Sequence, residues 1–352
     1  MMMKIGMTAA LMAAAMTLLS GSHDRGFSHD LSGDGPKPWT HLDFQDDPDD
    51  FHFAIVPDRT GGDFRGAFTN ALAKVNLLRP AFVMTVGDLI PGLKPPKVIR
   101  PQQIALTNMA SKVIAPFFYV VGNHDIGRSR PSYPLNSEES LAVWKEFFGE
   151  RTYYSFMYRG VLFVVLNTVE GRDSRRPQCG ITKEQYDWFR KTLAEHADAR
   201  WTMVFMHQPS VWRTAEWEAV EKGELANRNY TVFAGDWHHY IYARRRGREY
   251  YVLAVAGGCG SREGNSRELM GREYGEVDHV TWVTMTKAGP VVANLTLDGI
   301  LPGDWLTQKT TLSREQPYPI DEPADPEVVE KLSKIAAENA ARKNAASGGA
   351  KK

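Results

Sequence analysis

Five apolar stretches of the sequence each end in a residue that could bind a metal ion. The residues at these ends are Asp58, Asp88, Asn123, His207 and the pair Asp236 and His238. Carboxylate oxygens, amide oxygens and imidazole nitrogens are common protein ligands of metal ions. Because the carboxyl ends of strands form the ligand site in open α/β sheets, we expect these side chains to gather in one cluster.

Such a cluster suits the hydrolysis of phosphate esters. The reaction needs an activated water, neutralisation of charge on the phosphoryl oxygens, and a proton for the leaving group. Two metal ions roughly 3.5–4 Å apart can supply the first two requirements. A carboxylate can bridge two such ions, and a histidine can act as the general acid that supplies the proton.

In their order along the chain, these motifs resemble the calcineurin-like metallophosphoesterase family. That family has Asp-x-His, Gly-Asp, Gly-Asn-His-Asp/Glu, a lone His and Gly-His-x-His. The matching segments here are Asp58-Arg59-Thr60, Gly87-Asp88, Gly122-Asn123-His124-Asp125, His207 and Gly235-Asp236-Trp237-His238. The resemblance covers about Phe51 to Trp305, and the Gly-Asn-His-Asp run is its most specific part.

The resemblance implies two overlapping sets of metal ligands. The first ion would be bound by Asp58, Asp88 and His238, and the second by Asp88, Asn123, His207 and Asp236. Asp88 would then bridge the two ions.

The resemblance also implies roles in catalysis. His124 would face the substrate and protonate the leaving oxygen, and Asp125 would orient its imidazole. Arg59 could bind a phosphate oxygen of the substrate, or it could pair with a structural carboxylate.

Two positions depart from the family pattern. Thr60 stands where the family usually has a His ligand, and Asp236 stands where it has another. A hydroxyl and a carboxylate are harder ligands than two imidazoles, so we expect manganese, iron or magnesium in preference to zinc. Residues 58 and 60 would point the same way from an extended strand end, as would residues 236 and 238.

The expected activity is metal-dependent hydrolysis of a small phosphate monoester or diester, with a metal-activated hydroxide as nucleophile. The alternative is a protein of the same fold that binds metal or phosphoryl groups but has lost catalysis, with Thr60 marking the loss. The sequence has 42 lysine and arginine residues in total and 42 aspartate and glutamate residues in total. This balance gives no strong positive field, so a nucleic-acid partner is not expected.

Alternating strands and helices must position these residues. Buried strands are predicted at 51–56, 81–86 and 117–121, with helices at 64–78 and 103–113 between them. This rhythm is typical of parallel α/β units. A second run of elements follows, with strands at 153–158, 161–167, 201–206, 230–234 and 250–255, helices at 138–148, 182–197 and 212–225, and a hairpin over 277–297. The resemblance implies an α/β fold of four layers, in which two sheets form a sandwich flanked by helices.

The remaining segments divide the chain into functional parts. Residues 1–22 read as a signal peptide, with a positive Lys4 before an apolar run; a retained membrane anchor is the alternative. We expect a polar linker at 23–50, the catalytic domain at 51–305 and a C-terminal tail at 306–352. The protein is therefore expected to be exported to the periplasm or secreted, without stable membrane insertion after cleavage.

Two further features leave alternatives open. Cys179 and Cys259 are the only cysteines, and an oxidising compartment would allow them to pair. A basic cluster at residues 244–248 could form the polar edge of a hairpin or contribute to substrate binding.

Overall fold

The computed structural model describes residues 49–60, 66–126, 137–171, 179–257, 275–297 and 299–302. All of these lie in one compact unit that runs from Pro48 to Lys352. The helices are α1 (Ala67–Leu78), α2 (Pro96–Ala110), α3 (Ser137–Phe148), α4 (Lys183–Glu195) and α5 (Ala215–Lys222), with a 3-10 helix η1 (Pro209–Arg213) before α5. The strands are β1 (Phe51–Val56), β2 (Val83–Thr85), β3 (Phe117–Phe118), β4 (Tyr154–Tyr158), β5 (Val161–Leu166), β6 (Trp201–Met206), β7 (Tyr230–Ala234), β8 (Ile241–Arg245), β9 (Arg248–Val252), β10 (His279–Thr286), β11 (Gly289–Thr296) and β12 (Gly299–Pro302).

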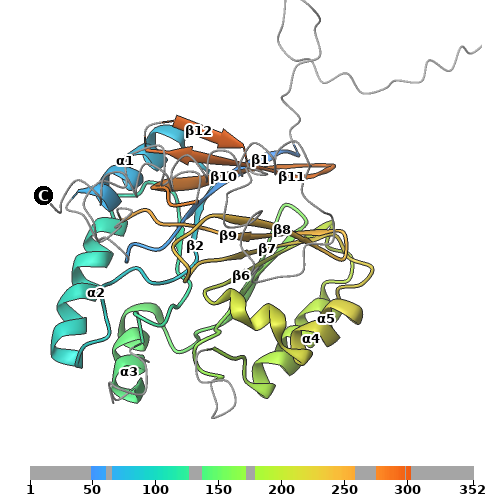
Figure 1. The fold of residues 1–352 in the computed structure, drawn as a ribbon, viewed down its shortest axis with the longest axis horizontal. Coiled ribbons are helices and arrows are strands. Elements are labelled where there is room, and N and C mark those ends of the chain that lie inside the picture. The colour runs from blue at the N-terminus through green and yellow to red at the C-terminus, as the bar shows by residue number, and fades with distance from the viewer. Residues whose placement is uncertain are drawn as a thin grey trace, which may run out of the picture. The chain divides into compact units, whose positions relative to one another are not determined.

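The strands form two six-stranded sheets (Figure 1). The first has the order β12-β11-β10-β1-β2-β3, in which β1, β2 and β3 run parallel and β10 to β12 pair antiparallel. The second has the order β4-β5-β6-β7-β9-β8, with a parallel centre from β5 to β9. The carboxyl ends of the parallel strands in each sheet therefore lie at one edge of that sheet.

The alternation of side chains along β1 shows how the layers pack. Phe53 and Ile55 belong to the core between the two sheets, where the ring of Phe53 meets that of Phe163 from β5 edge to face at 5.3 Å. Ala54 and Val56 point to the other face and pack in a core that contains side chains of α1 and α2. Both faces of β1 are buried, as expected for a strand inside a covered sheet.

The outer face of the second sheet is covered in the same way. Phe189 of α4 and Trp217 of α5 pack in one core with side chains of β5, β6 and β7. Figure 1 shows α4 and α5 on the side of the second sheet that points away from the first sheet. The four layers are thus helices, sheet, sheet and helices, and the predicted fold class is confirmed.

Several predicted elements differ in length, for reasons visible in their hydrogen bonds. Strand β3 has only two residues, because the Thr85 hydroxyl accepts the Val120 amide at 2.8 Å and ends the ladder. The helix expected over 212–225 is divided at Thr214, whose side chain caps α5 by accepting the Trp217 amide. Helix α2 begins at Pro96 rather than at residue 103, since proline suits the first helical turn.

The basic cluster forms the hairpin edge that the sequence predicts as one alternative. Strands β8 and β9 pair antiparallel around Arg246. Arg245 is buried in this hairpin, and its guanidinium binds both carboxylate oxygens of Glu221 at 2.9 and 2.7 Å. This arginine has a structural partner.

Three sequence predictions fall outside the described residues, namely the signal peptide, most of the linker and the C-terminal tail. Cys179 is buried, but Cys259 also lies outside the described residues, so their pairing stays a prediction. Among the residues that are described, none belongs to a helix long and apolar enough to cross a bilayer.

Candidate metal centre

The two sheets bring the six predicted ligands together at the ends of their parallel strands. Asp58 follows β1, Asp88 follows β2, and Asn123 lies beyond β3. His207 comes directly after β6 of the second sheet, and Asp236 and His238 follow β7. The predicted clustering is therefore present in the structure, with ligands from both sheets.

His207 lies at the centre of the cluster and is fully buried. Its Nδ1 lies 2.8 Å from the Val86 carbonyl oxygen, which can only accept, so Nδ1 carries a hydrogen. In the neutral ring the lone pair is then on Nε2. That atom faces the Asn123 Oδ1 at 3.0 Å, the Asp88 Oδ2 at 3.2 Å and the Asp236 Oδ1 at 3.5 Å. A lone pair surrounded by acceptor oxygens is repulsive unless a proton or a metal ion lies between them.

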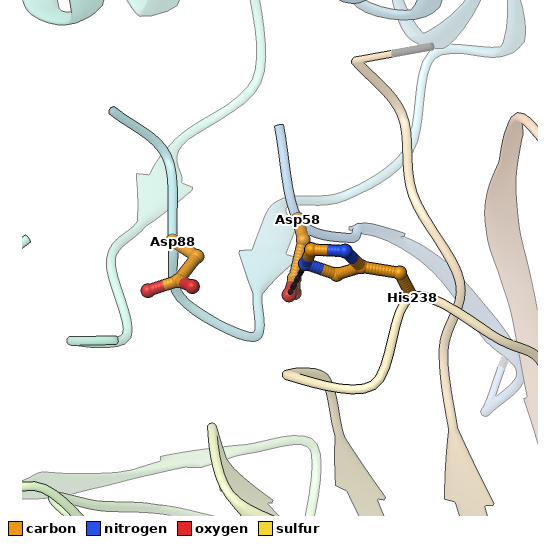
Figure 2. A group of neighbouring side chains, drawn as sticks. All are labelled: Asp58, Asp88 and His238. Atoms are coloured by element: carbon orange, nitrogen blue, oxygen red, sulfur yellow. Dashed lines mark ion pairs between the residues drawn. The ribbon is translucent and has the colours of Figure 1, made fainter. Parts of the chain in front are cut away.

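Asp58, Asp88 and His238 form a second group, shown in Figure 2. One potential ligand atom from each of the three lies within 4.8 Å of the other two. Asp58 Oδ2 accepts the Asp236 amide at 2.9 Å and lies 3.6 Å from His238 Nε2. Asp58 Oδ1 is buried and has no hydrogen-bond partner among the described residues. Buried carboxylate oxygens are seldom left without a partner, so this atom fits a metal ligand.

Two glycines leave room for these carboxylates. A Cβ added at Gly235 would lie 2.2 Å from Asp58 Oδ1. A Cβ added at Gly122 would lie 2.2 Å from Asp88 Oδ1 and 2.4 Å from the Asp88 amide nitrogen. These separations are far below van der Waals contact, so the glycines of both motifs are required by the packing of the acidic residues.

The backbone of the last motif is a turn, and the expectation of an extended strand end at residues 236–238 is wrong. Asp236 has φ 69° and His238 has φ 56°, and Asp88 is also left-handed with φ 53°. Left-handed conformations cost non-glycine residues about 1–2 kcal/mol each. Such strain is concentrated at functional sites, where the surrounding structure maintains it. Here the Asp236 amide is held by Asp58, which fixes the turn against the first sheet.

The electrostatics of the cluster favour a bound cation. Burial acts to lower the pKa of His207, but the carboxylates of Asp88 and Asp58 outweigh it and hold that pKa well above its usual value. Burial raises the pKa of Asp58 well above its usual range; Asp88 adds to the rise and His207 opposes it. Burial acts to raise the pKa of Asp88 too, but the His207 and His124 imidazoles outweigh it, so that pKa is instead lowered. A carboxyl group that resists ionisation, that of Asp58, beside an imidazole that retains its proton indicates excess negative charge, which a metal ion would neutralise.

His124 has a different partner from the one expected. Its Nδ1 lies 2.6 Å from the Pro91 carbonyl oxygen, so Nδ1–H donates there and Nε2 is left facing Asp88 Oδ2 at 3.8 Å. Its side chain is 26% exposed, as contact with a substrate requires.

Asp125 is fully buried and accepts the backbone amides of Asp88, Leu89 and Gly122 at 2.9, 3.1 and 2.8 Å. The expectation that Asp125 orients the imidazole of His124 is therefore wrong. Its carboxylate is directed at the loop backbone and fastens the Gly-Asp motif to the Gly-Asn-His-Asp motif. Burial, with a further contribution from the Asp88 carboxylate, raises the pKa of Asp125 to about 7.

Arg59 and Thr60 border the first group of ligands. The Arg59 guanidinium lies over the ring of Phe68, 5.7 Å from its centroid, and is part exposed. Thr60 is buried, and its hydroxyl has no hydrogen-bond partner among the described residues. The amides of both residues donate to the Asp88 carbonyl oxygen, which ties the Asp58 loop to the Asp88 loop.

The backbone carbonyls that orient the two histidines were not identified from the sequence. Val86 and Pro91 supply them, and neither residue type indicates such a role. Pro91 does lie in a Pro-rich loop directly after the Gly-Asp motif, but only the path of that loop brings its carbonyl to His124.

Comparisons with known proteins agree with this geometry. Residues 50–243, more than half of the chain, match the family model described as calcineurin-like phosphoesterase. Serine/threonine-protein phosphatase CPPED1 of Mus musculus is 29% identical over 212 residues, which are 54% of this chain and 62% of that protein. The Bos taurus protein of the same name is 30% identical over 145 residues, 40% of this chain and 43% of its own length. The matches thus span less than two thirds of these relatives.

Solved structures share the fold at low sequence identity. A dimetal phosphatase from Danio rerio aligns with a TM-score of 0.50 and 14% identity, over 71% of this chain and 98% of that chain. Purple acid phosphatase PPD1 from yellow lupin aligns with a TM-score of 0.51 and 14% identity, over 71% of this chain and 52% of that one. The chain belongs to the calcineurin-like phosphoesterase family.

Proposed function

We propose that the protein hydrolyses the ester bond of a small phosphorylated substrate with two metal ions bound by Asp58, Asp88, Asn123, His207, Asp236 and His238. The observation that supports this most strongly is the convergence of three oxygen ligands on the Nε2 atom of the fully buried His207. Bound ions at such a cluster supply charge neutralisation and activate the attacking water. The oxygen-rich ligand set favours manganese, iron or magnesium over zinc.

His124 is proposed as the general acid. Because its Nδ1–H donates to the Pro91 carbonyl, the proton for the leaving oxygen must come from Nε2, the part-exposed side of the ring. The same hydrogen bond fixes the plane of the imidazole. Asp125 contributes indirectly, since it positions the loop that carries His124 through the amides of Asp88 and Gly122.

Arg59 is proposed to bind a phosphoryl oxygen of the substrate. Its position over the Phe68 ring limits the freedom of the side chain, which lowers the entropy lost on binding. The curated relatives are named as serine/threonine-protein phosphatases, so phosphoserine and phosphothreonine monoesters belong among the candidate substrates. Export through a signal peptide stays a prediction, because residues 1–22 lie outside the described part of the chain.

The test uses p-nitrophenyl phosphate and bis-p-nitrophenyl phosphate with manganese-loaded protein. We expect His124→Ala to lower turnover by about 10²–10⁴-fold while bound manganese, measured by elemental analysis, is unchanged. The matched control is His52→Ala, because His52 is exposed at the opposite end of β1 and should not affect turnover. No turnover by the metal-loaded wild-type protein on a broad phosphoester panel would favour the non-catalytic alternative.

A further inference from the structure

The ligand cluster consists of two unequal groups that share Asp88. Four side chains form the first group, which we call the four-ligand position: Asn123, Asp88 and Asp236 surround His207 Nε2 at 3.0 to 3.5 Å. The other group, Asp58, Asp88 and His238, contributes three side chains and is called the three-ligand position.

Burial and pre-organisation also differ between the two positions. The central imidazole of the four-ligand position is fully buried and its ring is fixed by the Val86 carbonyl. The imidazole of the three-ligand position, His238, has a side chain that is 34% exposed. One carboxylate oxygen of Asp58 already accepts the Asp236 amide, so only Oδ1 remains without a partner.

The hydroxyl that stands in place of a fourth ligand on the Asp58 loop would add little binding energy. Thr60, two residues after Asp58, offers a hydroxyl that is buried but neutral. Affinity for a cation rises with the number and charge of protein ligands and with the rigidity of the site. A fixed imidazole further strengthens binding, because less order has to be created when the ion enters.

From these differences we propose that the two metal positions have different affinities. This inference rests on the proposed function, since it concerns the same ions. The four-ligand position retains its ion, whereas the ion at the three-ligand position exchanges with solution. The concentration of free metal would then control the activity, because the complete site forms only when the weaker position is filled.

The test measures how many manganese ions the full chain binds and how their affinities compare. Wild-type protein is loaded with Mn²⁺, desalted into metal-free buffer and analysed for ions per chain, and the desalted protein is then titrated with Mn²⁺ by calorimetry. We expect one retained ion and a second binding step that is at least about tenfold weaker. Electron paramagnetic resonance should show isolated Mn²⁺ after desalting and a spin-coupled pair after titration.

Two variants show which manganese-binding step belongs to the four-ligand position and which to the three-ligand position. His238→Ala should keep the retained ion and lose the weaker step. Asn123→Ala should lose the retained ion, because it removes a ligand of the four-ligand position only. Far-ultraviolet circular dichroism checks that both variants are folded; both residues are part exposed, so neither change empties a core site.

The outcomes separate this inference from the function that it deepens. Two retained ions of equal affinity would overturn the inequality and leave metal-dependent hydrolysis intact. Loss of the retained ion in His238→Ala but not in Asn123→Ala would overturn the assignment of positions. A wild-type protein that binds no manganese at all would contradict the proposed function as well.

Discussion

Replacing Asp125 tests whether this residue acts on the loop backbone or on the imidazole of His124. The carboxylate is fully buried and accepts three backbone amides, those of Asp88, Leu89 and Gly122. Asp125→Ala would leave three buried N–H groups without acceptors. Each such group lowers the free energy of unfolding by about 1–3 kcal/mol. Water that enters the vacated space should keep each loss near the lower limit, so we expect a total loss of about 3 kcal/mol.

Asp125→Asn provides the matched comparison. Its amide oxygen can still accept the amides of Asp88 and Gly122, which bind the same carboxylate oxygen, and only the Leu89 amide then loses its acceptor. The neutral side chain also removes the charge repulsion with Asp88, which contributes to the raised pKa of Asp125. We therefore expect a loss of about 1 kcal/mol in the free energy of unfolding.

Urea unfolding in the presence of a chelator, followed by tryptophan fluorescence, measures both variants without contributions from metal. The expected order of stability is wild type, then Asp125→Asn, then Asp125→Ala. The opposite result is that both variants are as stable as the wild type while the alkaline limb of the pH–rate profile, where a general acid loses its proton, is displaced in both. That result would mean that Asp125 acts on the imidazole of His124 instead.

Three further changes test other parts of the structure. Gly235→Ala should abolish the weaker binding step at the three-ligand position, because its Cβ would lie 2.2 Å from Asp58 Oδ1; Gly247→Ala, whose Cβ would meet nothing within 4 Å, should keep both binding steps. His279 is buried and its pKa is lowered to about 4, so its contribution to stability is complete above about pH 6.5 and is lost as pH falls towards 4, by roughly 3 kcal/mol. His279→Asn should flatten this pH dependence in urea titrations, and an unchanged slope would rule the histidine out as its source. Thr182→Ala removes the side-chain cap of α4 and should cost about 1 kcal/mol in unfolding free energy, whereas Thr182→Ser should cost little; equal losses would show that the cap is not the cause.

The gathering of the six proposed metal ligands could be predicted because their positions follow from strand endings. An apolar run that stops at Asp88 or His207 shows both where a strand ends and which side chain stands at its carboxyl end. Parallel pairing then brings these ends to one edge of each sheet. The pairing of the two sheets was implied by family resemblance, since residues 51–56 alone do not specify which aromatic rings they meet.

Contacts made by the backbone could not be predicted in the same way. The Pro91 carbonyl orients His124, and a carbonyl is common to every residue type. The role of Asp125 was misassigned because a carboxylate next to a histidine suggests a side-chain pair, whereas the left-handed turn at Asp88 presents backbone amides to it. The turn at Asp236 was missed because left-handed aspartates carry no sequence signal as strong as glycine.

Anomalous diffraction from crystals grown with Mn²⁺ would locate the bound ions. We expect a manganese peak bounded by His207 Nε2, Asn123 Oδ1 and an Asp88 carboxylate oxygen, at roughly 2.0–2.5 Å from each. Manganese bound elsewhere on the chain, with His207 Nε2 still directed at those oxygens and no ion between them, would contradict that expectation.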